Sequence, residues 1–187
     1  MKLLPGILIC LIAATASATA VIGVYAGETG EICEADIDAG GNVTLLILAR
    51  IDPFEFSGGI TAAEFRIDNL PSGGGYPEGV ISPQWTSTVV VGDLFTDFSI
   101  AWSSPQYGPL VTIGSVNFQA FDGGWIGTQR AMEVMEGDVC GCIAVVDDYL
   151  VAHEAAGGRF TFNCGYDCGC GGIQSTESDW GEVKTLY

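Results

Sequence analysis

The sequence predicts an all-β fold, a single antiparallel β-sandwich of about nine short strands. Apolar residues recur with a period of two between Val21 and Cys164, which is the spacing of strands with one buried face. Turn-forming clusters of Gly, Pro, Asn and Asp separate these runs at intervals of roughly 8–15 residues. No strand–helix alternation occurs, which excludes a doubly wound or barrel α/β fold. The length of 187 residues fits one domain.

The individual strands follow from this alternation. The nearly continuous apolar run 44–51 is typical of a strand covered on both faces. Apolar–polar alternation predicts three half-buried strands, over 63–67, 98–103 and 160–164. The runs 149–153 and 159–163 flank Gly157-Gly158 and predict a closing hairpin.

The run from Leu110 to Phe121 contains a change of parity. Its apolar residues occupy odd positions up to Ile113 and even positions from Val116 onward. A single inserted residue shifts the parity in this way, and glycine tolerates the insertion. We therefore predict a β-bulge at Gly114-Ser115.

The N-terminus has the layout of a secretory signal peptide. Lys2 precedes an apolar run over 3–14, and small residues follow it. Ala-x-Ala sites predict cleavage after Ala18 or Ala20. A retained anchor is the alternative, but the run is shorter than the about 20 residues that span a bilayer. We therefore expect an exported chain, secreted or at the cell surface, with no stable membrane span.

The chain accordingly divides into three parts. These are a signal peptide (1–20), a β-sandwich domain with a cysteine-rich end (21–170), and a linker with a short helical tail (171–187). Lipid attachment at Cys10 is a weaker alternative to cleavage, because Ile9 is larger than the small residue that such processing requires.

Signal removal leaves an even number of cysteines, which favours disulfides in an oxidising compartment. The six are Cys33, Cys140, Cys142, Cys164, Cys168 and Cys170. Six cysteines allow 15 pairings. Because a bridge within a C-x-C pair is strained, we expect bridges from Cys140-Gly-Cys142 to the 164–170 cluster. Cys33 would then tie the start of the domain to its end. Zinc ligation by these cysteines is the alternative, although structural zinc sites usually use longer C-x2-4-C spacings.

The tail after the cysteine cluster predicts a short helix. Ser178 can cap it, and an apolar side is formed by Trp180, Val183, Leu186 and Tyr187. A helix of this length is marginal in water, so it needs a docking surface to be ordered. The tail either packs on its own domain or frays, or it serves as a docking or sorting tag.

The charge balance excludes several partners. Six basic residues face 23 acidic ones, for a formal net charge of −17. So few cations cannot form a patch for nucleic acid or anionic lipid. Only 16% of the residues are charged, which leaves uncharged surface for protein partners or self-association.

Catalytic and metal-binding motifs are weak in this sequence. His153 is the only histidine, and no G-x-S-x-G motif accompanies it, so we predict that the chain is not an enzyme and needs no cofactor. Asp36 and Asp38 resemble the start of a calcium loop, but the position of its bidentate glutamate is Ile47. Calcium at this loop is therefore a weak expectation, and an Asx-type turn explains the residues better.

Two tryptophans are candidates for glycan contact. Trp85 and Trp125 are flanked by polar or Gly-rich sequence, so exposed rings at these positions could stack on sugars. Trp102 shares a stripe with Phe98 and Ile100 and is better explained as core.

Three short segments resemble a known group of proteins. Gly58–Ile67 (GGITAAEFRI) resembles a strand of poorly characterised exported bacterial proteins, in which it follows an IG(V/I)Y strand, here Ile22–Tyr25. Those proteins end in WG-x-(V/I)-K-x-L-Y, matched by Trp180–Tyr187. The resemblance implies a cohesin-like or immunoglobulin-like β-sandwich and export, with no assigned activity. The region Cys140–Cys170 is richer in cysteine than the resemblance implies.

Together these features predict an exported structural or adhesive interaction module that binds proteins or its own copies. A carbohydrate-binding module is the second interpretation, and a polysaccharide-acting enzyme is the third.

Overall fold

A computed structural model describes residues 19–70, 79–121, 127–138, 141–166 and 168–170. These residues form strands and no helix, which confirms the all-β prediction over this part of the chain. The first strands are β1 (Ala20–Tyr25), β2 (Glu34–Ala35), β3 (Asn42–Ile51), β4 (Ile60–Asp68), β5 (Gly79–Trp85), β6 (Val89–Asp93) and β7 (Asp97–Gln106). The others are β8 (Leu110–Ala120), β9 (Arg130–Met135), β10 (Ala144–Asp147), β11 (Ala152–Glu154), β12 (Ala156–Gly157) and β13 (Arg159–Phe162).

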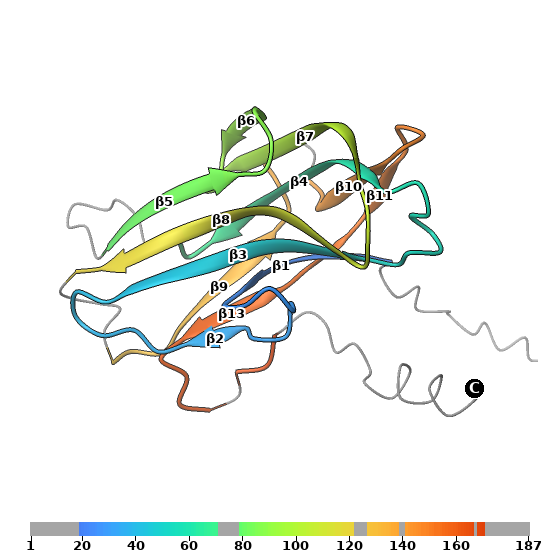
Figure 1. Ribbon diagram of the computed structural model, residues 1–187. Helices are drawn as coiled ribbons and strands as arrows, with labels where there is room; N and C mark the ends of the chain where they lie inside the picture. The colour runs from blue at the N-terminus through green and yellow to red at the C-terminus, as the bar shows by residue number, and fades with distance from the viewer. Residues whose placement is uncertain (1–18, 71–78, 122–126, 139–140, 167, 171–187) are drawn as a thin grey trace, which may run out of the picture.

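The strands form two sheets, which overlap in the view of Figure 1. The smaller sheet has the order β12-β1-β3-β8-β5. The larger one runs β11-β10-β4-β9-β13-β2, with β7 beside β4 and β6 beside β7. A single apolar core lies between them, and both sheets contribute to it. Its largest fully buried side chains are Tyr25, Phe65, Phe98, Phe118, Phe160 and Phe162.

A bulge in β8 is confirmed, and it lies at Ile113-Gly114, one residue before the predicted Gly114-Ser115. Ile47 of β3 pairs with Gly114, whereas the next residue, Leu48, pairs with Thr112. Ile113 is the extra residue, and both Ile113 and Gly114 are buried. A side chain at position 114 would collide with the Trp85 ring, so the close packing of β5 on β8 requires glycine there.

The expectation of about nine antiparallel strands needs two corrections. The described residues form thirteen strands, several of which contain only two or three residues and are too short to show a periodicity. The sheets are also mixed, because β12 pairs with β1 and β2 pairs with β13 in parallel. The strands that pair in parallel, β2 and β12, contain two residues each and lie at the ends of their sheets.

The predicted closing hairpin around Gly157-Gly158 is wrong. β11 pairs with β10, whereas β13 pairs with β9 and β2. At Gly158 the chain crosses from one sheet to the other. Its N–H donates to the Ile22 carbonyl of β1 at 2.8 Å, and its own carbonyl accepts from the Val134 N–H of β9 at 2.9 Å.

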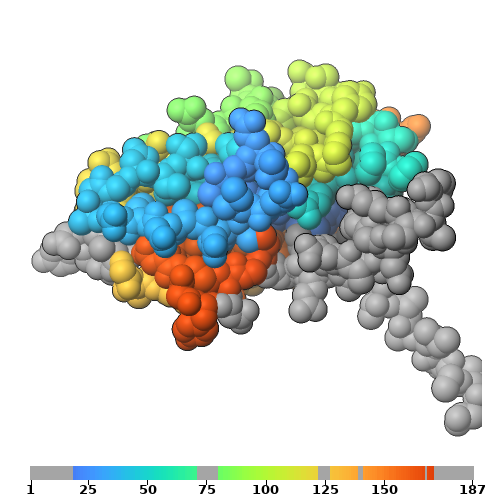
Figure 2. All heavy atoms as spheres, turned by 60° about the horizontal axis from the view of Figure 1, so that its bottom comes forward, coloured from blue at the N-terminus to red at the C-terminus, as the bar shows by residue number. Residues whose placement is uncertain are grey.

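The two ends of the domain lie side by side. The Cys33–Cys170 disulfide joins them, with the two Cα atoms 5.2 Å apart. β2 pairs with β13 beside this bridge, and Figure 2 shows the N-terminal segments in blue against the C-terminal ones in orange. The expected link between the start and the end of the domain is thus formed.

Residues 171–187 lie outside the described residues, and the expected tail helix with Trp180, Val183, Leu186 and Tyr187 falls there. In the described part of the chain, no helix is long and apolar enough to cross a membrane.

A substitution at Gly157 tests how closely the main chains pack where the chain crosses between the sheets. A Cβ at this position would lie 1.9 Å from the Val134 carbonyl oxygen, which is main chain and has little room to move. We expect Gly157→Ala to lower the free energy of unfolding by about 2–3 kcal/mol, measured by urea unfolding under non-reducing conditions. Gly169→Ala is the control, because nothing lies within 4 Å of a Cβ there. Equal stabilities for the two variants would contradict the steric explanation.

The structure also discriminates between the two expected cleavage sites. The Thr19 carbonyl accepts the Asp52 N–H at 3.0 Å, and Ala20 is fully buried in β1 opposite Ile51. Cleavage after Ala20 would remove both contacts, so we expect the mature protein to begin at Thr19. N-terminal sequencing of the exported protein checks this, and a start at Val21 would contradict it.

Candidate functional site

An apolar row crosses the outer face of the larger sheet. The register aligns Val89 of β6 with Ala101 of β7, Ala101 with Ala62 of β4, and Ala62 with Val146 of β10, which in turn faces Ala152 of β11. Five strands thus place five apolar side chains in one line on the side away from the core. A solvated sheet face normally carries polar residues at such positions.

A second row runs beside the first. It consists of Val91, Ser99, Glu64, Ala144 and Glu154, in the same strand order. The two valines of β6 are the exposed large hydrophobic residues of these rows. Val89 is 56% exposed and Val91 is 68% exposed. The charged groups of the two rows are both acidic.

The two rows enclose a shallow hollow of about 260 Å³, which we call the outer-face groove. Alanines from β4, β7 and β10 line its middle, and valines from β6 and β10 rise at either side. Small side chains between larger ones leave space for an apolar group of a partner. The shape therefore follows from residue size along the cross-strand rows.

The cysteines are paired differently from the expectation. Cys164 bonds to Cys168 within the C-terminal cluster, and Cys170 bonds to Cys33. Cys142 is disulfide-bonded as well, to a partner outside the described residues, and Cys140 also lies outside them. The expected bridges from Cys140-Gly-Cys142 to the cluster are therefore wrong, because all three cysteines of the cluster are bonded elsewhere.

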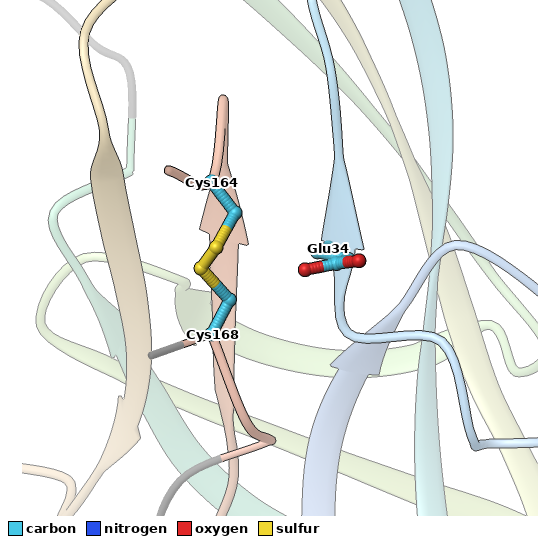
Figure 3. Close-up of side chains that lie close together, drawn as sticks. All are labelled: Glu34, Cys164 and Cys168. Atoms are coloured by element: carbon cyan, nitrogen blue, oxygen red, sulfur yellow. A yellow bond between two sulfur atoms is a disulfide. The ribbon is translucent and has the colours of Figure 1, made fainter. Parts of the chain in front are cut away.

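These bonds also decide against the zinc alternative at the cluster. Cys164, Cys168 and the Glu34 carboxylate of β2 lie within 4.8 Å of one another. Figure 3 shows the two sulfur atoms joined, with Glu34 beside them. Disulfide sulfurs are not thiolates and do not provide zinc ligands.

The predicted glycan-binding tryptophans do not form a platform within the described residues. The Trp85 ring is half-buried and packs on Phe98, with the ring centroids 4.1 Å apart. Trp125 lies outside the described residues. Trp102 is buried, as expected, and its indole N–H donates to Thr86 Oγ1 at 2.9 Å.

The aspartates of the weak calcium prediction are both exposed. Asp36 and Asp38 flank the buried Ile37, and the Asp38 carbonyl accepts the Gly41 N–H at 2.8 Å. This hydrogen bond closes a turn before β3. Calcium binding at these residues stays a prediction.

His153 holds two loops together at one end of the sheets. Its Nε2 lies 2.9 Å from Asp147 Oδ2, and its Nδ1 lies 3.7 Å from Glu55 Oε1. Its ring also meets Phe56 edge to face. Contacts on both nitrogens and on the ring give the imidazole a positioning role between the β3–β4 and β10–β11 loops.

Asp147 fixes the loop between β10 and β11. Its Oδ1 accepts the N–H groups of Tyr149 and Val151 at 2.9 and 2.8 Å. Leu150 at the tip has a φ of 65° and is 79% exposed, an unfavourable conformation for a branched apolar residue. The hydrogen bond with His153, followed by that with Val151, holds the pKa of Asp147 below its usual range.

The residues of the groove were missed in the sequence because their signal is weak. Alternation placed Ala101 on the outward side of its strand, but an isolated alanine at such a position is unremarkable in any one strand. The Val89-Val90-Val91 run, which does not alternate, was the one local sign. Only the cross-strand register shows that these residues share a row.

No protein-family model matches the chain, and no curated protein matches it. Among solved structures, it is similar to the sixth cohesin of Acetivibrio cellulolyticus scaffoldin B, crystallised with the Cel5 dockerin, at 12% identity and a TM-score of 0.49 over 78% of this chain and 99% of that one. CaCohA2 from Clostridium acetobutylicum is similar at 13% identity and a TM-score of 0.49, over 78% and 90% of the two chains. BcpA, the major pilin subunit of Bacillus cereus, gives 12% identity and 0.43 over 77% and 39%. Likenesses this distant assign neither a family nor an activity to the chain.

The pKa of Asp147 predicts how acid affects this end of the molecule. A carboxyl whose pKa is lowered by folding stabilises the folded state above its ordinary pKa, and this contribution is lost as the pH falls through the lowered value. We therefore expect Asp147→Asn to lower the Tm at pH 7, and we expect the Tm difference from the unsubstituted protein to disappear as the pH falls through the lowered pKa of Asp147.

Thermal unfolding across this pH series provides the measurement, and Asp148→Asn, at the exposed neighbouring position, is the control. A Tm difference for Asp147→Asn that is the same at acid and neutral pH would contradict the assignment.

Proposed function

We propose that this chain is an exported structural or adhesive module that binds a protein segment in the outer-face groove. The observation that carries the proposal is the apolar row from Val89 to Ala152 across five strands. The two facing sheets support the finer architecture that the resemblance implies, a cohesin-like or immunoglobulin-like β-sandwich, which is part of this proposal.

The row supports binding because its apolar surface is unfavourable in water. Contiguous exposed apolar surface on a soluble domain marks an interaction site more often than chance. Burial of such surface contributes about 25 cal/mol for each Å² removed from water. An apolar side chain of a partner that enters the groove would bury its surface against the alanines that line its middle, and this burial would stabilise the complex.

The charges around the groove indicate the chemistry of the partner. Glu64 and Glu154 are the charged members of the second row, and the chain as a whole has a formal net charge of −17. Acidic partners would be repelled. The groove therefore suits a segment with apolar side chains and flanking basic residues.

Export is proposed from two features together. The first twenty residues have the layout of a signal peptide, and disulfides persist in oxidising compartments. We propose that the mature chain is secreted or held at the cell surface. That it is not an enzyme stays a prediction.

Peptide selection tests the groove. The mature protein, immobilised with its disulfides intact, is screened against a phage-displayed peptide library. We expect peptides with apolar and basic residues, and we expect Ala101→Arg to weaken their binding about tenfold or more, because its side chain fills the groove and displaces the apolar ligand group.

Ser103→Arg is the matched control for this substitution. Ser103 lies on the same strand and the same outward side as Ala101 but outside the groove, so the control adds the same charge nearby. Peptide binding that is unchanged in Ala101→Arg would contradict the proposal. A glycan array in parallel would favour the carbohydrate-binding interpretation if it showed a saccharide preference.

A further inference from the structure

The open edge of β6 differs from the other sheet edges that the structure describes. Among the strands that the structure describes, β6 pairs with β7 alone, from Val89 opposite Ala101 to Asp93 opposite Asp97. Its other side is therefore an edge with backbone N–H and C=O groups available for pairing. In Figure 1 it lies at the top of the molecule, at the end of the larger sheet.

The remaining described edges are protected. β2 and β12 contain two residues each and β11 three, which is too short to pair a long partner strand. β5 is longer, but it contains Pro83, which has no backbone N–H to donate to a partner strand. Short strands and edge prolines are two of the devices by which proteins avoid edge-to-edge pairing.

β6 has neither device. Residues 89–92 read Val-Val-Val-Gly and contain no proline and no charge, and Asp93 stands at the end. Valine has a high strand propensity. An exposed apolar edge strand of this kind is a template for another strand.

The hydrogen bonds along β6 determine which groups face outward. Ser87 Oγ donates to the Ala101 carbonyl and accepts the Val89 N–H at 3.1 Å, so the Val89 N–H faces β7. In an antiparallel strand the backbone groups of successive residues point to opposite sides. The N–H and C=O of Val90 therefore face away from β7, toward the open side.

We propose that a second copy of this chain pairs its β6 with this edge, antiparallel and about a twofold axis at Val90. Each Val90 N–H then donates to the Val90 carbonyl of the other copy, which closes a hydrogen-bonded pair. Val89 of one copy stands opposite Val91 of the other. Asp93 extends past the paired valines, opposite Ser87, so no carboxylate faces a carboxylate.

The pairing also joins the outer-face grooves of the two copies. The apolar row of one copy continues from Val89 into Val91 of the other, and the larger sheets become one sheet across the axis. The Val89 and Val91 side chains, 56% and 68% exposed in the single chain, then gain apolar neighbours. This inference goes beyond the proposed function, because it names the strand and the register through which the chain binds its own copies.

The size of the contact and the net charge set the strength of the dimer. Five-residue strands form a small interface, so association is weak and depends on concentration. Two such acidic chains repel each other, since even the full sequence with Lys2 has a formal net charge of −17, whereas the paired strands themselves carry little charge. Because salt screens the repulsion between distant charges, the dimer strengthens as ionic strength rises.

Analytical ultracentrifugation of the mature, disulfide-bonded protein up to about 1 mM tests the proposal. We expect a monomer–dimer equilibrium that shifts toward dimer with added NaCl. Val91→Lys places a charge on the exposed edge and is expected to raise the dissociation constant about tenfold or more. Val80→Lys is the matched control, since Val80 is 46% exposed on the proline-protected strand β5, and it should leave the equilibrium unchanged.

A monomer at every concentration and salt would overturn the inference. A dimer that survives Val91→Lys, or one that Val80→Lys weakens equally, would also overturn it. Ala101→Arg separates the two proposals, because it fills the groove and leaves the outward backbone of β6 intact. Loss of peptide binding without loss of the dimer assigns the two properties to separate surfaces.

Discussion

The structure depends on the place where the main chain passes from one sheet to the other, at Gly157 and Gly158. Gly158 donates to β1 and accepts from β9, so one residue satisfies backbone groups in both sheets. The approach is close enough that a side chain at Gly157 would meet the Val134 carbonyl. The Arg159 N–H then donates to the Cys170 carbonyl, next to the disulfide that fastens Cys33. In the chain-entropy model, a bridge across a sequence separation of 137 residues contributes about 5 kcal/mol. The crossing and the disulfide together hold the first and last strands over one core.

The larger sheet uses its two faces for different purposes. Phe65, Phe98 and Ile100 of β4 and β7 point into the core, and the intervening residues face outward. The outward residues include Ala62 and Ala101 of the apolar row, which has no charged group along its line, whereas Glu64 of β4 stands in the row beside it. The same sheet ends in an unprotected edge at β6, whereas the neighbouring edge of the smaller sheet carries Pro83. An apolar face and an open edge that adjoin each other are costly for a solitary domain, and both become favourable once a partner covers them.

The sequence predicted some of these features and missed others for identifiable reasons. The parity change between Ile113 and Val116 is local, and it located the β8 bulge because an inserted residue moves every later side chain to the other face. The runs around Gly157-Gly158 had the local pattern of a hairpin, but they do not pair with each other. β11 pairs with β10 and β13 pairs with β9. Trp85 stood in a polar setting along the chain, yet its ring packs on Phe98, a residue of another strand. The cysteine spacing left 15 pairings open, and the argument from strain in C-x-C pairs selected bridges that do not form.

The sequence by itself determined the all-β class, the longer strands and the bulge, because alternation along a strand depends only on neighbouring residues and on the solvent. It also determined the charge balance that shapes the choice of partners. The tertiary structure alone decided the disulfide pairing, the crossing at Gly158, the short parallel strands and the apolar row of the outer face. Each of these depends on which distant residues stand opposite one another. Register is a relation between strands, set by packing of the whole core, and no single segment of the chain contains it.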